Sequence, residues 1–141
     1  MAKTKKLEEV KVENVLLIDE DQIDNFINER MILSTNFSNS VVVKNSALDA
    51  LAYLKKLTES KATMPEIIFL DLNMPVMDGF GFLDELAKLP AVLEAIQPKT
   101  KIIVLSSSIS PLDIDRASAN ALVYKYFNKP LTEKYLNAIN L

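Results

Sequence analysis

The chain contains no cysteine and no histidine, and these two absences exclude several kinds of chemistry. Without cysteine, neither disulfide bonds nor thiolate catalysis is available. Without histidine, the chain lacks the commonest general base and the commonest nitrogen ligand of metals. Any metal that binds here must therefore be a hard cation held by oxygen atoms, such as Mg²⁺, Mn²⁺ or Ca²⁺.

The chain also lacks a strong excess of either charge and a long apolar run. Its 141 residues carry a net charge of −3, which argues against a basic surface for nucleic acid. No apolar run approaches the roughly 20 residues that cross a bilayer. The N-terminal lysines precede no apolar stretch, so no signal peptide is expected. Since 49% of the residues are apolar, the composition predicts one folded domain, with no membrane span and a cytoplasmic location.

Five short apolar runs, most of them rich in β-branched residues, are spread along the chain. Most are continuous rather than alternating, a pattern typical of strands buried on both faces of a parallel sheet. Segments with helical spacing separate them, so strands and helices alternate. The pattern predicts an α/β fold with helices on both faces of the sheet. The expected strands are 15–18, 41–43, 67–70, 102–105 and 121–127.

Five helices are predicted between and after these strands. Ile23, Phe26, Ile27 and Met31 give the first of them an apolar face by their spacing. The others are expected to begin near Ser46, which with Asp49 resembles a capping box, and near Phe80, Pro111 and Thr132. Residues 89–98, between two prolines, are predicted to add only an extra helical turn.

Polar residues follow four of the five predicted strands. They are Asp19-Glu20-Asp21 after the first strand, Asp71 after the third, Ser106-Ser107-Ser108 after the fourth and Asn128-Lys129-Pro130 after the fifth. The carboxyl ends of parallel strands meet at one edge of the sheet. We therefore expect acids, a hydroxyl and a lysine from distant parts of the sequence to converge in one crevice.

These residue types together point to phosphoryl transfer. Two unit charges about 4 Å apart repel by roughly 4 kcal/mol at an effective dielectric constant near 20, so either a carboxyl pKa rises or a cation binds. Mg²⁺ usually takes one or two carboxylates together with water and phosphate oxygens. Lys129 supplies a positive charge for an anion, and Ser106 supplies a hydroxyl donor. These are the parts that stabilise transfer of a phosphoryl group to a carboxylate, here Asp71.

Four segments carry a resemblance to a known family, namely 16–21, 71–79, 103–107 and 128–130. Through them, residues 14–141 resemble the receiver domain of bacterial two-component response regulators, of the single-domain chemotaxis-like type. The resemblance implies a flavodoxin-like, doubly wound five-stranded parallel sheet with strand order 2-1-3-4-5 and five flanking helices. It also implies a receiver domain, here placed at residues 13–141, and the charged residues 1–12 before it are predicted to form a tail.

The resemblance further implies a role for each residue of the crevice. Asp71 would accept a phosphoryl group from a sensor histidine kinase or a histidine phosphotransfer protein. Ser106 would hydrogen-bond to that group, and Lys129 would form an ion pair with it. Tyr126 would turn inward when Ser106 moves, and the Lys129–Pro130 peptide bond would be cis.

A divalent cation is also implied by the resemblance. Asp19, Glu20, Asp71 and the backbone carbonyl of Asn73 would hold Mg²⁺ or Mn²⁺. Glu20 stands where aspartate is more frequent, and Asp21 adjoins it, so the main direct ligand among these acids stays open. Ser106 stands where many relatives have threonine.

The output that the resemblance implies is binding of another protein. The changing face would run from Pro111 to Asn137, over the fourth helix, the fifth strand and the fifth helix. The downstream partner is unknown. The chain is expected to be a signalling phosphoacceptor, which catalyses only its own phosphorylation and dephosphorylation, rather than an enzyme.

Simpler interpretations exist for several of these residues. Asp19 and Glu20 could cap the first helix. Gly79 is expected to be structural, because glycine allows a positive φ where a helix begins. A pseudo-receiver that binds partners without phosphorylation is one alternative function. An aspartate-nucleophile phosphatase is another, although Asn73 occupies the position where such an enzyme has a second carboxylate.

Overall fold

The computed structural model describes residues 10–141, so most of the tail predicted for residues 1–12 lies outside the described residues. Packing of the described chain begins before residue 13. Val12 is 2% exposed, and its N–H donates to the Phe37 carbonyl at 3.0 Å. The domain start at residue 13 remains a prediction, and Val12 already belongs to the packed core.

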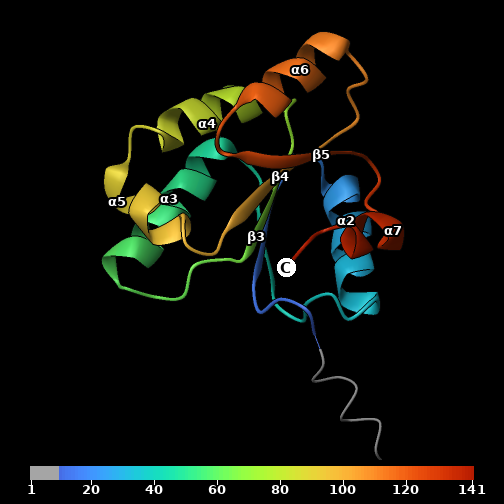
Figure 1. Cartoon of the computed structure of the whole chain (residues 1–141), viewed down its shortest axis with the longest axis horizontal. Helices are drawn as coiled ribbons and strands as arrows, with labels where there is room; N and C mark the ends of the chain where they lie inside the picture. Colours follow the sequence, from blue (N-terminus) through green and yellow to red (C-terminus); the bar gives the residue numbers. More distant parts are fainter. Residues whose placement is uncertain (1–9) are drawn as a thin grey trace, which may run out of the picture.

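Five parallel strands form one sheet in the order β2-β1-β3-β4-β5 (Figure 1). Their bounds are β1 Val15–Ile18, β2 Val41–Lys44, β3 Ile67–Leu70, β4 Lys101–Ser106 and β5 Val123–Asn128. In the register of the sheet, Val15 pairs with Val41 on one side and with Ile67 on the other. The predicted α/β class and the strand order 2-1-3-4-5 are both confirmed.

Six helices lie in the described part of the chain, one more than predicted. They are α2 Gln22–Ser34, α3 Ala47–Glu59, α4 Gly79–Leu86, α5 Pro90–Ile96, α6 Pro111–Ala119 and α7 Glu133–Asn137. The additional helix is α5, where only an extra turn was expected. It forms because Pro90 suits the first helical turn and because Val92 and Ile96, four residues apart, bury one side of the helix. Across residues 10–141, no helix combines the length and apolar character that a membrane span requires.

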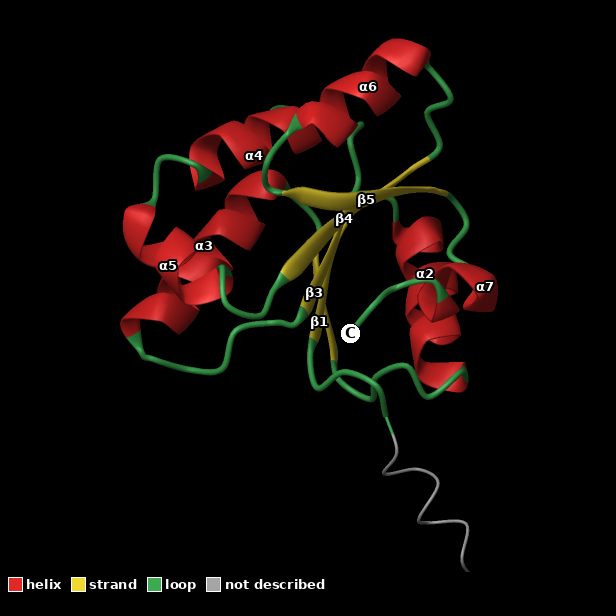
Figure 2. Cartoon of the chain, viewed as in Figure 1, coloured by secondary structure: helices red, strands yellow, loops and turns green. Residues whose placement is uncertain are grey.

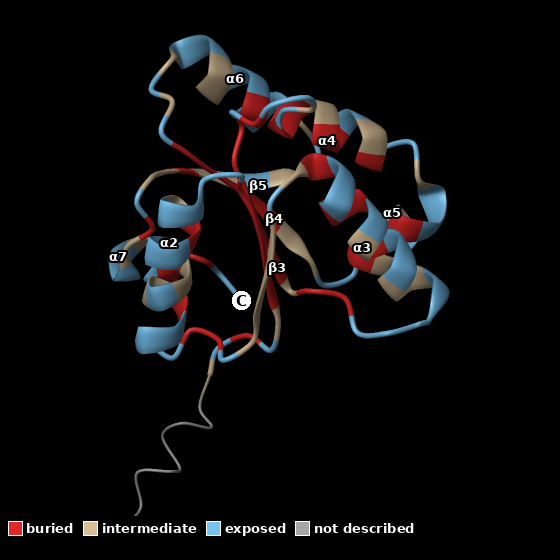
Figure 3. Cartoon of the chain, turned by 180° about the vertical axis from the view of Figure 1, so that it is seen from behind, coloured by how far each residue is buried: buried red, intermediate tan, exposed pale blue. Residues whose placement is uncertain are grey.

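The helices cover both faces of the sheet (Figure 2). α2 and α7 lie on one face, and α3, α4 and α5 lie on the other (Figures 1 and 3). Successive strand residues point to opposite faces. Leu16 and Ile18 of β1 therefore join the core beneath α3 and α4, whereas Val15 and Leu17 join the core beneath α2 and α7.

The buried face of α2 differs from the face that its apolar spacing predicted. Ile23, Phe26 and Ile27 are 71%, 61% and 44% exposed. The helix instead turns two amide side chains inward, and Asn25 and Asn28 are 6% and 1% exposed. The prediction was wrong because each amide makes a hydrogen bond in the interior, through Asn25 Nδ2 and Asn28 Oδ1, which offsets part of the cost of burial. An apolar surface is left facing outward on α2.

Two helix starts show which residues act as caps. Asp21 is the N-cap of α2, since its Oδ1 accepts from two N–H groups of the first turn at 2.9 and 3.0 Å. The alternative that Asp19 and Glu20 cap this helix is therefore wrong. Ser46 caps α3 as predicted, and its hydroxyl oxygen accepts from the Asp49 N–H at 3.1 Å.

Gly79 is structural for a reason other than the predicted positive φ, which no described glycine has. A Cβ atom at this position would lie 2.6 Å from the backbone oxygen of Asp71 and 2.9 Å from Leu72 Cα. Both neighbours are backbone atoms that cannot move aside easily. The start of α4 therefore packs directly against the segment that holds Asp71, and only glycine leaves room for it.

Candidate functional site

The ends of β1, β3 and β5 and the first turn of α2 surround a cavity of about 150 Å³. Its lining is polar and mostly acidic, and consists of Asp19, Glu20, Asp21, Asp24, Asp71, Asn73, Ser107 and Lys129. The structure thus brings together most of the residues singled out at the strand ends. Ser106 and Tyr126 lie outside this lining.

Lys129 is the only basic residue that lines the cavity, and it contacts three carboxylates. Its Nζ lies 2.6 Å from Asp19 Oδ2, 2.9 Å from Asp24 Oδ2 and 3.3 Å from Asp71 Oδ1. The lysine side chain is 10% exposed. An ammonium group has three N–H donors, so these contacts use all of them.

Asp71 is a buried carboxylate whose pKa is raised to about 6. Burial is the largest cause, and the negative charge of Asp19 adds to it. The charge and hydrogen bond of Lys129, together with the backbone N–H of Asn73, act in the opposite direction. Asp71 therefore remains mostly ionised at neutral pH although its surroundings oppose the charge.

The pKa of Lys129 is raised above its ordinary value. Burial alone would lower it, but the hydrogen bonds to Asp19 and Asp24 and the charge of Asp71 outweigh that effect. The lysine therefore carries a permanent positive charge at the base of the cavity. Such a charge suits an anionic ligand placed beside Asp71.

Two buried amide side chains of α2 form hydrogen bonds with the segments that follow β1 and β5. Asn25 Nδ2 donates to the backbone carbonyl of Asp19 at 2.8 Å, and Asn28 Oδ1 accepts from the Leu131 N–H at 3.1 Å. Sequence reasoning missed these residues and Asp24 as well. Their spacing along α2 was the available signal, since it places three polar residues on adjacent turns of one face.

The serines at the end of β4 and just after it lie in two environments. Ser106 is fully buried, and its hydroxyl oxygen accepts from the Ser108 N–H at 3.1 Å. Ser107 is exposed and lines the cavity. In this arrangement Ser107, rather than Ser106, is the serine whose atoms border the space beside Asp71.

Tyr126 is attached to the loop that follows β4. Its hydroxyl donates to the Ser108 carbonyl at 2.8 Å, and Asn128 Nδ2 donates to the same carbonyl at 3.1 Å. The ring of Tyr126 is partly buried against the core beneath α3 and α4. The Lys129–Pro130 peptide bond is cis, which is what the family resemblance implies.

The oxygen atoms at the cavity fit a hard divalent cation. Carboxylate oxygens of Asp19 and Asp71 both lie within 3.3 Å of one lysine nitrogen, so the two carboxylates converge. Glu20 and Asn73 line the same cavity. Within residues 10–141, no three acidic side chains are grouped as metal ligands. A site with two carboxylates leaves the other positions of Mg²⁺ to water and phosphate oxygens.

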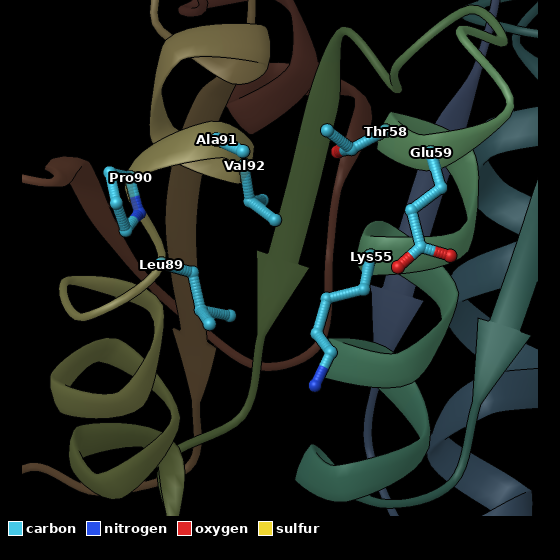
Figure 4. Close-up of a pocket in the computed structure, with 7 residues that line it drawn as sticks. All are labelled: Lys55, Thr58, Glu59, Leu89, Pro90, Ala91 and Val92. Carbon is cyan, nitrogen blue, oxygen red and sulfur yellow. The ribbon is translucent and has the colours of Figure 1, made fainter.

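A second cavity, of about 270 Å³, lies between the last turns of α3 and the start of α5 (Figure 4). Leu89, Pro90 and Val92 form its apolar side, and Lys55 and Glu59 of α3 form the other. Apart from that lysine and glutamate its lining carries no ionisable group. Most of the residues that the sequence analysis singled out for phosphoryl transfer line the acidic cavity and not this second one.

The comparison with family models gives one match, to the response regulator receiver domain over residues 15–140. Among curated proteins, the chain is 30% identical over 125 residues to the two-component response regulator ORR1 of Oryza sativa subsp. japonica. This alignment covers 87% of the chain and 52% of that protein. The chain is also 30% identical to the peroxide stress-activated histidine kinase mak1 of Schizosaccharomyces pombe, over 82% of the chain and 7% of that protein. The chain thus spans about half or less of the length of these relatives.

Solved structures with the same fold include single receiver proteins. A two component response regulator from Cytophaga hutchinsonii is 35% identical with a TM-score of 0.79, covering 90% of this chain and 92% of that one. A response regulator receiver protein from Dyadobacter fermentans is 29% identical with a TM-score of 0.75, covering 88% and 91%. The Mn²⁺-bound form of response regulator Rcp1 is 23% identical with a TM-score of 0.66, covering 88% and 86%, and shares the fold.

Proposed function

The chain belongs to the response regulator receiver domain family, and we propose that it accepts a phosphoryl group on Asp71 from a histidine kinase or a histidine phosphotransfer protein. The observation that carries this proposal is the contact of the buried Asp71 with Lys129 at the edge of the sheet. Since these 141 residues include no histidine, the phosphohistidine must lie outside them.

In the proposed step, a carboxylate oxygen of Asp71 attacks the phosphorus atom of the phosphohistidine. The new P–O bond forms as the P–N bond breaks, and the leaving imidazole takes a proton from solvent. Lys129 then donates to a phosphoryl oxygen in place of its 3.3 Å contact with Asp71 Oδ1. This contact offsets the charge on the transferring group, which is the main task in phosphoryl transfer.

We also propose that Asp19, Glu20, Asp71 and the Asn73 carbonyl hold Mg²⁺ or Mn²⁺ during this step. The convergence of the Asp19 and Asp71 carboxylates supports the proposal. Asp21 is less suited as a main ligand, because its Oδ1 already accepts two hydrogen bonds as the cap of α2. A bound cation supplies positive charge that neutralises the phosphoryl oxygens.

The signal is proposed to leave through the face formed by α6, β5 and α7, from Pro111 to Asn137. Ser106 would turn its hydroxyl toward the phosphoryl group and release the Ser108 N–H. Because Tyr126 is bonded to the Ser108 carbonyl, movement of this loop would reach β5 directly. An unidentified downstream protein would bind the altered face, and a cytoplasmic location stays a prediction.

Intact-mass spectrometry tests the proposed function. Wild-type protein incubated with Mg²⁺ and acetyl phosphate should gain the mass of one phosphoryl group, and Asp71→Asn should gain none. Asp78→Asn is the matched control. Asp78 is an exposed acid of the same loop that caps α4, and asparagine also serves as a cap. This control should be phosphorylated like the wild type.

Other outcomes would replace the proposal. If the folded wild type gains no mass with several acyl phosphate donors, the pseudo-receiver function is favoured. If an unrelated phosphate ester is hydrolysed over many turnovers, the protein is a phosphatase. A mass gain that survives in Asp71→Asn would move the phosphoacceptor to another residue.

A further inference from the structure

Lys129 contacts a third carboxylate, Asp24, to which the proposed transfer assigns no task. Asp24 lies in the first turn of α2, 105 residues before the lysine in the chain. Its Oδ2 accepts from Lys129 Nζ at 2.9 Å, a shorter distance than that to Asp71. The Asp24 side chain is 35% exposed and lines the cavity, so it stands at the side of the site nearer to solvent.

The position of Asp24 in its helix makes this contact informative. Asp21 is the N-cap of α2, so Asp24 is the third helical residue, where an acid commonly bonds back to the N–H of the cap residue. Here the Asp21 N–H donates to Asp19 Oδ1 at 3.0 Å instead. The Asp24 carboxylate is therefore not used by its own helix and is directed to Lys129.

The distance between Asp24 and Lys129 is fixed by the packing of α2. Asn25, the next residue, is bonded to the backbone of Asp19. Asn28, one turn further, accepts from the N–H of Leu131, two residues after the lysine. Both amides are buried. The helix is thus attached to both segments that the ion pair joins, and Asp24 is held facing the ammonium group.

We propose that Asp24 is a positioning residue for phosphoryl transfer, which anchors the ammonium group of Lys129 while one of its N–H donors turns to the phosphoryl group. The proposal rests on the proposed function of Asp71. Asp24 and Asp19 keep the two shorter contacts, at 2.9 and 2.6 Å, and the 3.3 Å contact to Asp71 is the one exchanged. With only Asp19 as a partner, the flexible lysine stem would leave the ammonium group less well placed.

The test compares Asp24→Ala and Asp24→Asn with wild type in Mg²⁺-dependent phosphorylation by acetyl phosphate. Asp49→Ala is the matched control, because Asp49 is an exposed acid at the same position of another 13-residue helix. The maximal rate should fall about tenfold in Asp24→Ala and less in Asp24→Asn, which keeps an oxygen acceptor. The half-saturating donor and Mg²⁺ concentrations should stay within about twofold, and Asp49→Ala should behave like wild type.

A second measurement follows the lysine directly and needs no phosphorylation. The ¹⁵N resonance of the Lys129 ammonium group is visible when hydrogen bonds slow its proton exchange with water. We expect this resonance to broaden or disappear in Asp24→Ala and Asp24→Asn and to persist in Asp49→Ala. Urea unfolding checks that each variant is folded under these conditions.

The outcomes separate this proposal from the proposed function. An unchanged or faster maximal rate in a folded Asp24→Ala protein would overturn the anchoring role, since loss of a nearby negative charge alone would speed the reaction. An unchanged lysine resonance would overturn it as well. If wild type is not phosphorylated at all, the proposed function fails, while the lysine resonance still decides whether Asp24 anchors Lys129.

Discussion

Asp71 carries its charge at a place where burial and the carboxylate of Asp19 both oppose ionisation. Lys129 compensates in part, and the remaining imbalance appears as a carboxyl pKa of about 6. A bound cation would supply the missing positive charge. Phosphorylation would convert the Asp71 carboxylate into an acyl phosphate and place the negative charge on the phosphoryl oxygens, where Lys129 and a cation would neutralise it.

This imbalance predicts a dependence of stability on pH. Because the folded state raises the pKa of Asp71 from 3.8 to about 6, the folded protein binds the proton more tightly than the unfolded chain. The stabilising contribution is complete below pH 4 and is lost as the pH rises through 6. Relative to Asp71→Asn, wild type should lose about 2 to 3 kcal/mol of unfolding free energy between pH 4 and pH 7.

Urea unfolding of both proteins in chelator-containing buffer measures this difference. The comparison with Asp71→Asn cancels the titration of the other acids, which act similarly in both proteins. A parallel pH dependence of the two proteins would show that the pKa of Asp71 is not raised. Added Mg²⁺ at pH 7 should stabilise wild type more than Asp71→Asn.

Gly79 gives a second prediction at the residue scale. In Gly79→Ala the new methyl group would meet the Asp71 oxygen and Leu72 Cα, both backbone atoms. We expect the unfolding free energy to fall by about 1 to 3 kcal/mol, with slower phosphorylation because the Asp71 segment must shift. Gly81→Ala is the control, since its Cβ would meet Cγ of the partly buried Met77 side chain, which can rotate aside, and no backbone atom. Urea unfolding should show the control within about 1 kcal/mol of wild type; equal losses in both variants would contradict this account.

At the scale of elements, α2 shows where prediction from sequence succeeds and where it stops. Its apolar spacing correctly predicts a helix, but spacing alone cannot say which face is buried. Asn25 and Asn28 occupy the inner face because each forms a hydrogen bond with a backbone group of a distant segment. Those groups come from the ends of β1 and β5, and only the assembled sheet brings them near α2.

The same limit applies to the site. Asp71 and Lys129 could be placed together from the sequence, because both follow strands whose ends must meet at one edge. Asp24 could not, since its contact with Lys129 depends on how α2 is rotated over the sheet. The structural role of Gly79 could be predicted from the sequence. Its physical reason, the close approach of the Asp71 and Leu72 backbone, could be found only in the structure.

The hydrogen bond between Asn28 of α2 and Leu131, in the loop after β5, leads to a prediction for α2. In Asn28→Leu the buried N–H of Leu131 would lose its acceptor. Leaving such a group unpaired costs about 1 to 3 kcal/mol, so urea unfolding should show a loss of that size. Phosphorylation by acetyl phosphate should also slow, because Lys129 lies two residues before Leu131. Ser34→Ala, an exposed change on the same helix, is the control; a loss of stability without slower phosphorylation would mean that Asn28 serves folding alone.

At the scale of the whole molecule, three exposed apolar side chains lie within three residues in sequence of residues that line the acidic cavity. Ile23, Val76 and Ile109 are 71%, 98% and 80% exposed. Each belongs to a segment that follows a strand at the edge where Asp71 lies. Val76 also has φ of 70°, an unfavourable backbone conformation for a β-branched residue. If a protein brings a phosphohistidine to Asp71 as proposed, we expect it to contact these apolar side chains.

This arrangement predicts that a protein donor and a small donor respond differently to a change at one of these apolar side chains. Ile23→Ser removes an exposed apolar side chain next in sequence to Asp24, which lines the cavity, and stability should stay within about 0.5 kcal/mol of wild type. Transfer from a histidine phosphotransfer protein that phosphorylates the wild type should slow several-fold, while the rate with acetyl phosphate should not change, because the small donor needs only the cavity. Leu33→Ser, on the last turn of α2 and 38% exposed, is the matched control and should affect neither rate. Equal slowing with both donors would place the effect of Ile23 in the chemistry of the site, and no slowing with either would show that the donor approaches Asp71 without contacting this part of α2.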